Sequence, residues 1–214
     1  MFSYDMPDSD GVDEKKRSTL RRFATVGAAA PFAGFTERAS ADAGESEVRN
    51  AILGYLSTTP GAHFSKVRDD LQLGTGETQH HLRRLEEVDA IERYADGDYK
   101  RFVPAREFDA FEKAALGYLR RETPRGMLVA LLRNPSASPS TLASDLEVSA
   151  PTVSKYAGEL EESGLLSRAD GYRLERPETV LILLVRYAES FDEEAVELAG
   201  VADELLRYDG FDTP

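Results

Sequence analysis

The side chains best suited to chemistry in this sequence are its three histidines, which all fall within nineteen positions. His80 and His81 are adjacent, and His63 lies upstream. An imidazole can bind a metal ion, transfer a proton or hydrogen-bond to a nucleic-acid base. The stretch QHHLRR therefore raises three alternatives: a metal site, a catalytic pair, or a surface that contacts nucleic acid.

The spacing argues against the first two alternatives. Adjacent helical residues point about 100° apart, whereas histidines that share an ion are typically four positions apart. The chain has no Cys, and Glu77 and Glu86 do not complete an obvious ligand set. There is also no nucleophile elbow, phosphate-cradling glycine loop or HExxH helix. We therefore expect no metal, no cofactor and no catalytic residues, and predict that the protein is not an enzyme.

The net charge of −13 looks unfavourable for a protein that binds nucleic acid. Much of the excess lies at one end, because residues 177–214 carry ten acidic and only two basic side chains. Only six of the 26 basic residues are Lys, and scarce Lys beside abundant carboxylates is typical of proteins adapted to concentrated salt. Because the Debye length is about 3 Å at 1 M salt, this acidity is weak evidence against DNA binding.

The N-terminal 44 residues contain the stretch KKRSTLRRFATVGAAAPFAGF. Its paired Arg21 and Arg22, with Ala39-Ser40-Ala41 downstream, resemble a twin-arginine export signal. The apolar stretch is weak and contains Pro31, so we favour a largely disordered or partly helical arm that touches DNA, a partner or the protein's own surface. The longest apolar run in the body, Val180 to Val185, is too short for a membrane helix of roughly 20 residues. We expect a cytoplasmic protein without membrane contact.

One unit of sequence occurs twice, with a shift of 75 residues. PGAHFSKVRDDLQLGTGETQHHLRRLEEVDAIER (60–93) aligns without a gap with PSASPSTLASDLEVSAPTVSKYAGELEESGLLSR (135–168). The identical pairs include Pro60/Pro135, Ala62/Ala137 and Leu85/Leu160. Because both copies keep their apolar spacing, we expect one structural unit to be built twice.

Both copies show the same order of elements. In the first, a helix ends at Pro60-Gly61, and a short helix over 65–71, a Gly-Thr-Gly turn and a helix to about Asp89 follow. Strands IERYA and YKRFV then flank Asp96-Gly97-Asp98, a hairpin signal. The second copy repeats this with helices over 127–132, 138–146 and 150–163 and a hairpin around Asp170-Gly171. This is the winged helix-turn-helix order.

The predicted fold is mainly α with small β-hairpin wings, in two tandem winged helix-turn-helix domains plus C-terminal helices. The expected boundaries are an arm over 1–44, domain 1 over 45–105, a linker helix over 106–123, domain 2 over 124–176 and a helical segment over 177–214. The last segment, with its apolar faces, is expected to form a dimer or inter-domain contact; the alternative is that it completes the core of domain 2.

The first copy, PGAHFSKVRDDLQLGTGETQHHLRRLEE followed by IERYADGDYKRFVP, resembles the archaeal winged helix-turn-helix transcriptional regulators of the ArsR/MarR-like superfamily, especially tandem haloarchaeal forms. LASDLEVSAPTVSKYAGELEESGLL in the second copy resembles the same superfamily independently. The resemblance covers about residues 45–176. It implies binding to double-stranded DNA, commonly as a homodimer, with contacts to the transcription machinery or a small-molecule effector as further options.

The resemblance and the helical spacing together suggest the DNA-contacting side chains. Thr78, Leu82 and Leu85 form a packing stripe, so the residues on the other faces of the same helix are free to meet DNA. In the first copy these candidates are Thr75, Gly76, Glu77, Gln79, His80, Arg83 and Arg84, with Arg93, Lys100 and Arg101 on the wing. In the second copy they are Thr152, Ser154, Lys155, Arg168 and Arg173.

Three assignments within this set stay open. His80 is expected to face DNA, whereas His81 is expected to be a half-buried packing residue at the edge of the stripe. The wing cations either reach phosphates or are ordinary solvated strand residues.

We predict a sequence-specific DNA-binding transcriptional regulator; the alternative is an architectural or complex-assembly protein that uses its winged helices to bind protein.

Overall fold

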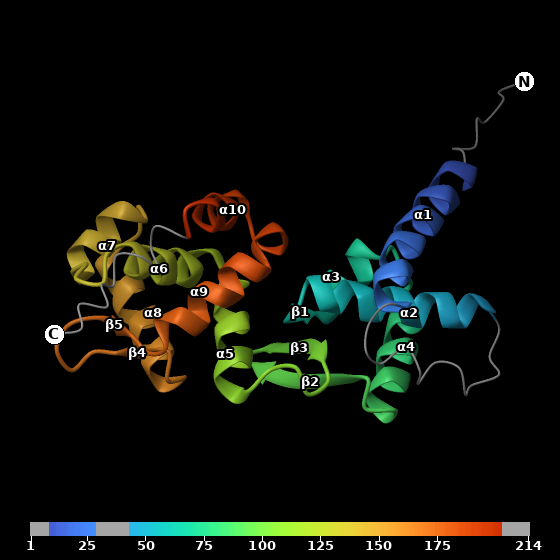
Figure 1. Ribbon diagram of the computed structural model, residues 1–214, viewed down its shortest axis with the longest axis horizontal. Helices are drawn as coiled ribbons and strands as arrows, with labels where there is room; N and C mark the ends of the chain where they lie inside the picture. Colours follow the sequence, from blue (N-terminus) through green and yellow to red (C-terminus); the bar gives the residue numbers. More distant parts are fainter. Residues whose placement is uncertain (1–8, 29–42, 203–214) are drawn as a thin grey trace, which may run out of the picture. The chain divides into compact units, whose positions relative to one another are not determined.

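The first repeat folds as a helix, a short strand, two helices and a hairpin in the computed structural model, which describes residues 9–28 and 43–202 (Figure 1). Its elements, in chain order, are α2 (Ala43–Thr58), β1 (Ala62–His63), α3 (Phe64–Asp70), α4 (Thr75–Glu87), β2 (Ile91–Asp96) and β3 (Tyr99–Pro104). The winged helix-turn-helix order predicted from the sequence is therefore confirmed, with β1 as an addition.

The core of this first unit, residues 1–107, forms where the three helices meet. Ile52 and Leu56 of α2 are fully buried and lie in one apolar cluster with Val67 of α3 and Leu85 of α4. These residues recur at helical spacing in the sequence, so burial of one stripe per helix fixes how the helices pack. Phe102 of β3 closes the cluster from the sheet side.

The sheet of the first unit has three antiparallel strands in the order β1, β3, β2. β2 pairs with β3 from Ile91 opposite Pro104 to Asp96 opposite Tyr99. β1 pairs with the other edge of β3, with His63 opposite Arg101. The strand that the sequence suggested as one arm of an exposed hairpin is therefore the central strand of the sheet.

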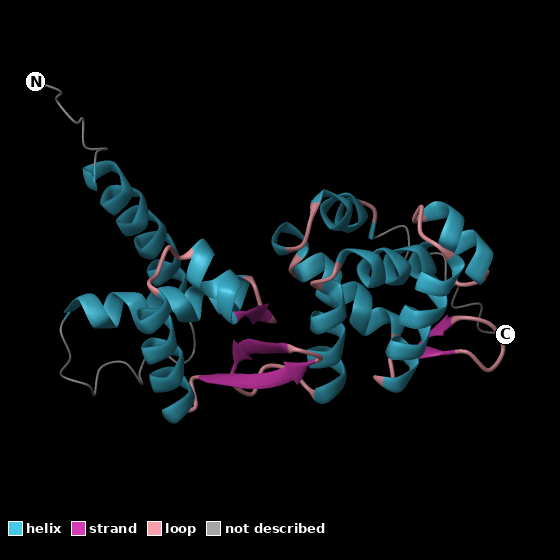
Figure 2. Ribbon diagram, turned by 180° about the vertical axis from the view of Figure 1, so that it is seen from behind, coloured by secondary structure: helices cyan, strands magenta, loops and turns pink. Residues whose placement is uncertain are grey.

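The second repeat lies in a second unit, residues 108–214, which Figure 2 shows to be mainly helical. Its elements are α5 (Ala110–Leu119), α6 (Glu122–Arg133), α7 (Pro139–Asp145), α8 (Ala150–Glu162), β4 (Leu166–Ser167), β5 (Arg173–Leu174), α9 (Pro177–Arg186), a 3-10 turn (Ala188–Ser190) and α10 (Glu193–Gly200). Ser149 caps α8, and its side chain accepts a hydrogen bond from the Thr152 backbone N–H.

Backbone geometry repeats along with the sequence. Gln72 and Glu147, which are 75 positions apart, both adopt left-handed φ angles, of 55° and 52°. The wing of the second unit is shorter, because Leu166 pairs with Leu174 whereas Ile91 pairs with Pro104 thirteen positions along. The second wing is therefore five residues shorter than the first.

The helices beside the second repeat belong to its core. The expected linker helix is α5, whose Ala115, Leu116 and Leu119 are fully buried and which packs against α6 and α9. In α9, the residues Val180, Leu181, Leu183 and Leu184 are buried. α9 thus contributes to the core of the second unit, which was the alternative to the expected dimer or inter-domain contact.

Part of the N-terminal arm forms a helix, α1 (Ser9–Ala28), which packs on α2. Leu20 is buried, and the Phe23 ring lies edge-on to Tyr55 with 5.3 Å between centroids. A Cβ at Gly27 or Gly54 would collide with backbone atoms of the opposite helix, so only glycine permits this close approach. Residues 9–28 therefore take the helical form of the arm, packed on the protein's own surface, and not the disordered form.

Two further expectations concern export and the membrane. The paired arginines of the twin-arginine-like stretch lie within α1, whereas Ala39-Ser40-Ala41 falls outside the described residues. None of the helices in the described ranges is both long and apolar enough to cross a bilayer.

Candidate nucleic-acid interface

α4 divides into a buried face and an exposed face. Thr78, Leu82 and Leu85 are buried with His81, and they anchor the helix on the core. On the other side, the exposed residues are Thr75, Gly76, Gln79, His80, Arg83 and Arg84. This is the division expected from the sequence, and it leaves amide, imidazole and guanidinium groups free to reach base edges and phosphates.

The N-terminal turn of α4 is held by Glu77. Its carboxylate accepts a hydrogen bond of 3.1 Å from the Gly74 backbone N–H and lies 3.1 Å from the Lys16 ammonium of α1. Although partial burial opposes the charge, the Gly74 N–H and Lys16 together keep the pKa of Glu77 below its ordinary value. Glu77, one of the predicted DNA contacts, is thus engaged as a helix cap, and α1 lies beside the end of the helix.

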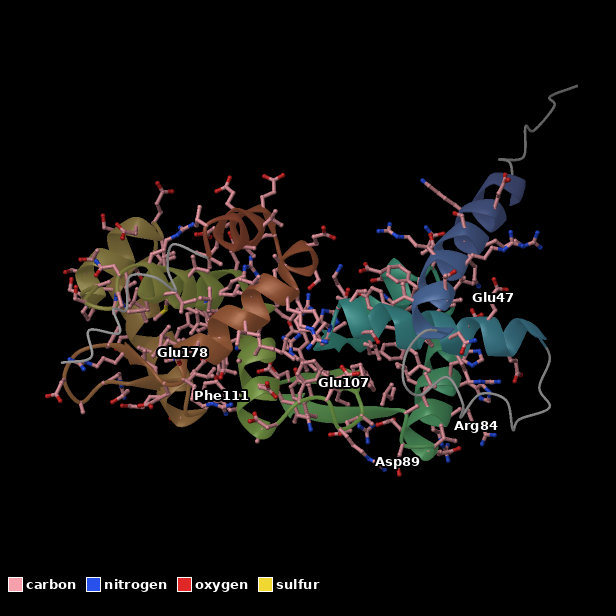
Figure 3. The ribbon with its side chains drawn as sticks, in the orientation of Figure 1. Glu47, Arg84, Asp89, Glu107, Phe111 and Glu178 are labelled. Carbon is pink, nitrogen blue, oxygen red and sulfur yellow. The ribbon has the colours of Figure 1, made fainter. Side chains whose placement is uncertain are left out.

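Cations on α4 and the wing form weak pairs with neighbouring carboxylates. Arg83 and Arg84 lie 3.0 and 2.9 Å from Glu87, and Arg93 of β2 lies 3.3 Å from Glu86. The arginine side chains are 50 to 78% exposed, and Arg84 projects away from α4 in Figure 3. Exposed pairs of this kind contribute about 0 to 1 kcal/mol, so these guanidinium groups can turn to phosphates at little cost.

Arg101 does not belong to this exposed surface, and its predicted DNA contact is wrong. Its side chain is 2% exposed, lies 2.5 Å from the Asp96 carboxylate and donates a hydrogen bond of 2.9 Å to the Gly61 carbonyl. The cause is β1, which makes β3 a central strand and encloses the Arg101 side chain. The sequence offered one hint, an Asp five positions upstream across the hairpin.

The remaining predicted wing residues, Arg93 and Lys100, are exposed. Tyr99 lies next to Lys100 at the end of the hairpin and is 49% exposed. Its ring is tilted against His63, with 5.2 Å between the centroids. The wing of the first unit thus presents two cations and one aromatic ring.

His80 and His81 occupy different environments. His80 is exposed, whereas His81 is 5% exposed, which is deeper than the half-buried position expected. Burial, then His80 and Arg49, lower the pKa of His81 below its ordinary value. Within the described part of the chain, no cluster of three or more His, Asp or Glu side chains could hold a metal ion.

The second unit carries a smaller set of polar groups at the equivalent places. Ser154 and Lys155 of α8 are exposed, whereas Thr152 is partly buried and its hydroxyl lies 2.8 Å from that of Ser149. Arg168 is held by Glu161, with 2.7 Å between Nε and the carboxylate, and Arg173 is exposed on β5. The surface of α8 therefore lacks the Gln, His and Arg combination of α4.

The individual cations of α1 were not among the DNA-contacting residues expected from the sequence. Lys15 and Arg22 are exposed, and neither has a carboxylate within ion-pair distance among the residues that the structure describes. Arg21, on another flank, lies 3.8 Å from Glu47 of α2. The available signal was a helical stripe of Lys16, Leu20, Phe23 and Gly27, which marks the face of α1 that packs on the domain.

Comparison with known proteins also finds two domains in tandem. Residues 46–116 match a family described as an N-terminal HTH domain, and residues 120–167 match the family of winged helix-turn-helix DNA-binding domains. The chain is 28% identical over 130 residues to an uncharacterized HTH-type transcriptional regulator of Methanocaldococcus jannaschii. That alignment covers 60% of this chain but only 32% of the relative.

No solved structure gives a significant match to the chain. The two family matches each fall on one repeat, and the second reaches the start of the wing after α8. The chain therefore carries two helix-turn-helix domains in tandem and is a homologue of an archaeal HTH-type transcriptional regulator.

Proposed function

We propose that the protein is a non-enzymatic, sequence-specific DNA-binding transcriptional regulator that reads the major groove with α4. The observation that carries this proposal is the exposed row of Gln79, His80 and Arg83 on a helix anchored by a buried stripe. In helix-turn-helix proteins the second helix of the motif enters the major groove, and a wing contacts flanking backbone. Arg93 and Lys100 would supply those flanking contacts.

The second unit takes a supporting part in this proposal. Ser154, Lys155 and Arg173 offer one hydroxyl and two cations, which suit phosphates better than base edges. Action on chromosomal DNA would place the protein in the cytoplasm. Contact with the transcription machinery, and the choice between repression and activation, are further steps that the DNA-binding surface leaves open.

The test is selection of bound duplexes from a random pool by the full chain, over a range of salt up to molar concentration. The selected sequences should share a discrete motif. In binding to that motif, His80→Ala or Arg83→Ala should cost about 1 to 3 kcal/mol and relax specificity at one base pair, as expected for a lost base contact. Arg186→Ala, which removes an exposed cation from α9, should leave the affinity nearly unchanged.

If the wild-type chain selects no motif, the proposal fails and the complex-assembly alternative gains support. If it selects a motif but His80→Ala and Arg83→Ala bind it normally, DNA binding stands and the assignment to α4 is wrong.

A homodimer is the second part of the proposal. Ile182 and Val185 of α9 are 60% and 40% exposed, and Val196 of α10 is 46% exposed, so apolar side chains remain outside the core of the second unit. Self-association through these residues would match two-fold symmetric operator sites. Sedimentation velocity should give a dimer for the wild type and a monomer for Ile182→Glu; a wild-type monomer at tens of micromolar would contradict it.

A further inference from the structure

The two units differ in the space between the wing and the turn that precedes the helix-turn-helix. In the first unit this space is closed. β1 pairs with β3, so Ala62 lies opposite Phe102, and the Arg101 side chain reaches the Gly61 carbonyl. The turn and the wing are thereby joined by backbone and side-chain hydrogen bonds.

In the second unit the equivalent space is open. Ala137 and Ser138 stand where Ala62 and His63 stand in the first repeat, but they form no strand. β5 pairs only with β4, and the counterparts of Phe102 and Arg101, which are Tyr172 and Gly171, fall outside β5. A cavity of about 850 Å³ lies there, between the end of α6, the turn, the wing and the start of α9.

The walls of this cavity are mostly apolar. Leu131 and Leu132 of α6, Leu174 of the wing and Leu181 of α9 line it, and Leu131 and Leu181 belong to the core of the unit. Pockets for small molecules typically measure about 300 to 1,000 Å³ and combine apolar walls with a few polar groups. The size and the lining of this cavity fit a small molecule better than a peptide segment with its own polar backbone.

The rim supplies the polar groups. Arg173 of the wing lines the cavity, and within the described residues no carboxylate lies at ion-pair distance from its guanidinium group. The neighbouring cations Arg168 and Arg176 are paired with Glu161 and Asp109. Asp170 of the wing hairpin, and Glu178 of α9, which Figure 3 labels, also contribute to the rim. The rim therefore carries both signs of charge, and Arg173 is its cation.

We propose that the second unit binds a small, largely apolar molecule with one acidic group in this cavity, with the acidic group beside Arg173. Binding would not depend on the proposed DNA-binding function. Because Arg173 and Leu174 are the whole of β5, the occupied cavity would hold the wing of the second unit against α6 and α9 in place of the missing third strand.

Two fluorescent probes of nearly the same shape separate the apolar and the anionic parts of this proposal. Anilinonaphthalene sulfonate carries an acidic group, and phenylnaphthylamine lacks it. Both should bind the folded full chain saturably, with one probe per chain. Arg173→Gln should weaken the sulfonate by about threefold and leave the neutral probe unchanged, as expected for one exposed ionic contact. Arg168→Gln, on the same wing and outside the cavity, should change neither.

A variant that fills the cavity gives an independent test. Ser136 lines the cavity and is exposed, so Ser136→Trp should place an indole in the space and weaken both probes by about tenfold or more. Ser140→Trp, on α7 and outside the lining, is the matched control. Circular dichroism melting checks that each variant is folded.

The proposal is overturned if the folded wild type binds neither probe saturably, or if Ser136→Trp binds both as tightly as Ser140→Trp does. If the probes bind as expected to a chain that selects no DNA motif, the cavity stands and only the proposed function fails.

Discussion

The two units fold from the same repeat but anchor their wings in different ways. The first has a third strand and a buried Arg101, whereas the second has two-residue strands and a cavity at the equivalent place. The difference lies in the wing, because the second wing is five residues shorter and β5 contains no counterpart of Arg101 and Phe102, the two residues of β3 that pair with β1. The two copies of the repeat thus keep the same helices and the same buried stripe. They differ in wing length, and with it in whether the space between the wing and the preceding turn is closed or open.

A second contrast concerns what covers the helix-turn-helix. Only the first unit has α1, which reaches Glu77 at the N-terminal turn of α4 through Lys16. In the second unit, α8 is capped from within its own segment, because the Ser149 hydroxyl accepts a hydrogen bond from the Thr152 backbone N–H. The first unit therefore has more base-reading side chains on its exposed helix, and it has an additional helix, α1, beside that helix.

Removal of the buried cation should have the largest effect on the contrast between the wings. Arg101→Ala leaves the Asp96 carboxylate, 10% exposed, without its guanidinium partner, and should lower the free energy of unfolding of the first unit by about 3 to 5 kcal/mol. Lys100→Ala, its exposed neighbour, should change it by less than about 0.5 kcal/mol. Urea unfolding with hydrogen exchange resolved by unit measures both. Equal losses would show that Arg101 is not part of the core.

Separation of α1 from α2 should have the next largest effect. A methyl group at Gly54 meets the Phe23 carbonyl oxygen, so Gly54→Ala should cost about 1 to 3 kcal/mol and expose α1 to hydrogen exchange. Gly76→Ala adds a methyl group in open space and should leave α1 protected. Unchanged protection of α1 in Gly54→Ala would contradict the close approach of the helices.

The Arg101 site and the contact between α1 and α2 are also the two features that the sequence did not predict. The helices and the hairpins were predictable because apolar spacing, glycine turns and the 75-residue repeat all agree. β1 was not, since two residues after a Pro-Gly turn carry no strand periodicity, and Arg101 was consequently placed on the surface. For α1 the sequence allowed a partly helical arm but did not identify its packing face, because the stripe that meets α2 includes a Lys and a Gly, which are not typical core residues.

The cations of α1 should matter for DNA affinity and not for sequence preference. Lys15 and Arg22 are seven positions apart, so they share one flank of α1. Lys16 of the same helix contacts Glu77 of α4. If both contact phosphates, the double variant Lys15→Gln/Arg22→Gln should reduce the slope of log affinity against log salt by about 0.9 per contact. The selected motif should stay the same.

A charge-matched control comes from the second unit. Arg133→Gln/Arg186→Gln removes two cations far along the chain from α1 and should keep the wild-type slope. If both double variants lower the slope equally, the effect reflects net charge, and α1 is not part of the DNA-binding surface.

The smallest expected effect is a dependence of stability on pH between 7.5 and 5.5, which should be confined to the first unit because all three histidines lie there. Burial, with His80 and Arg49 nearby, lowers the pKa of His81, and Glu77 and Glu45 oppose this only in part. The folded unit therefore holds the His81 proton less tightly than the unfolded chain does. It should lose stability as the pH falls through about 6.5, the ordinary value of histidine.

Burial likewise lowers the pKa of His63, so this residue adds a share of the same sign. His81→Asn, similar in size and unable to titrate, should flatten the dependence of the first unit without abolishing it. Unfolding at pH 7.5 and 5.5, resolved by unit, provides the measurement, and the second unit serves as an internal reference without histidine. A loss of stability of the first unit as steep in His81→Asn as in the wild type would mean that His81 is not the buried, poorly protonated side chain that distinguishes α4 from α8.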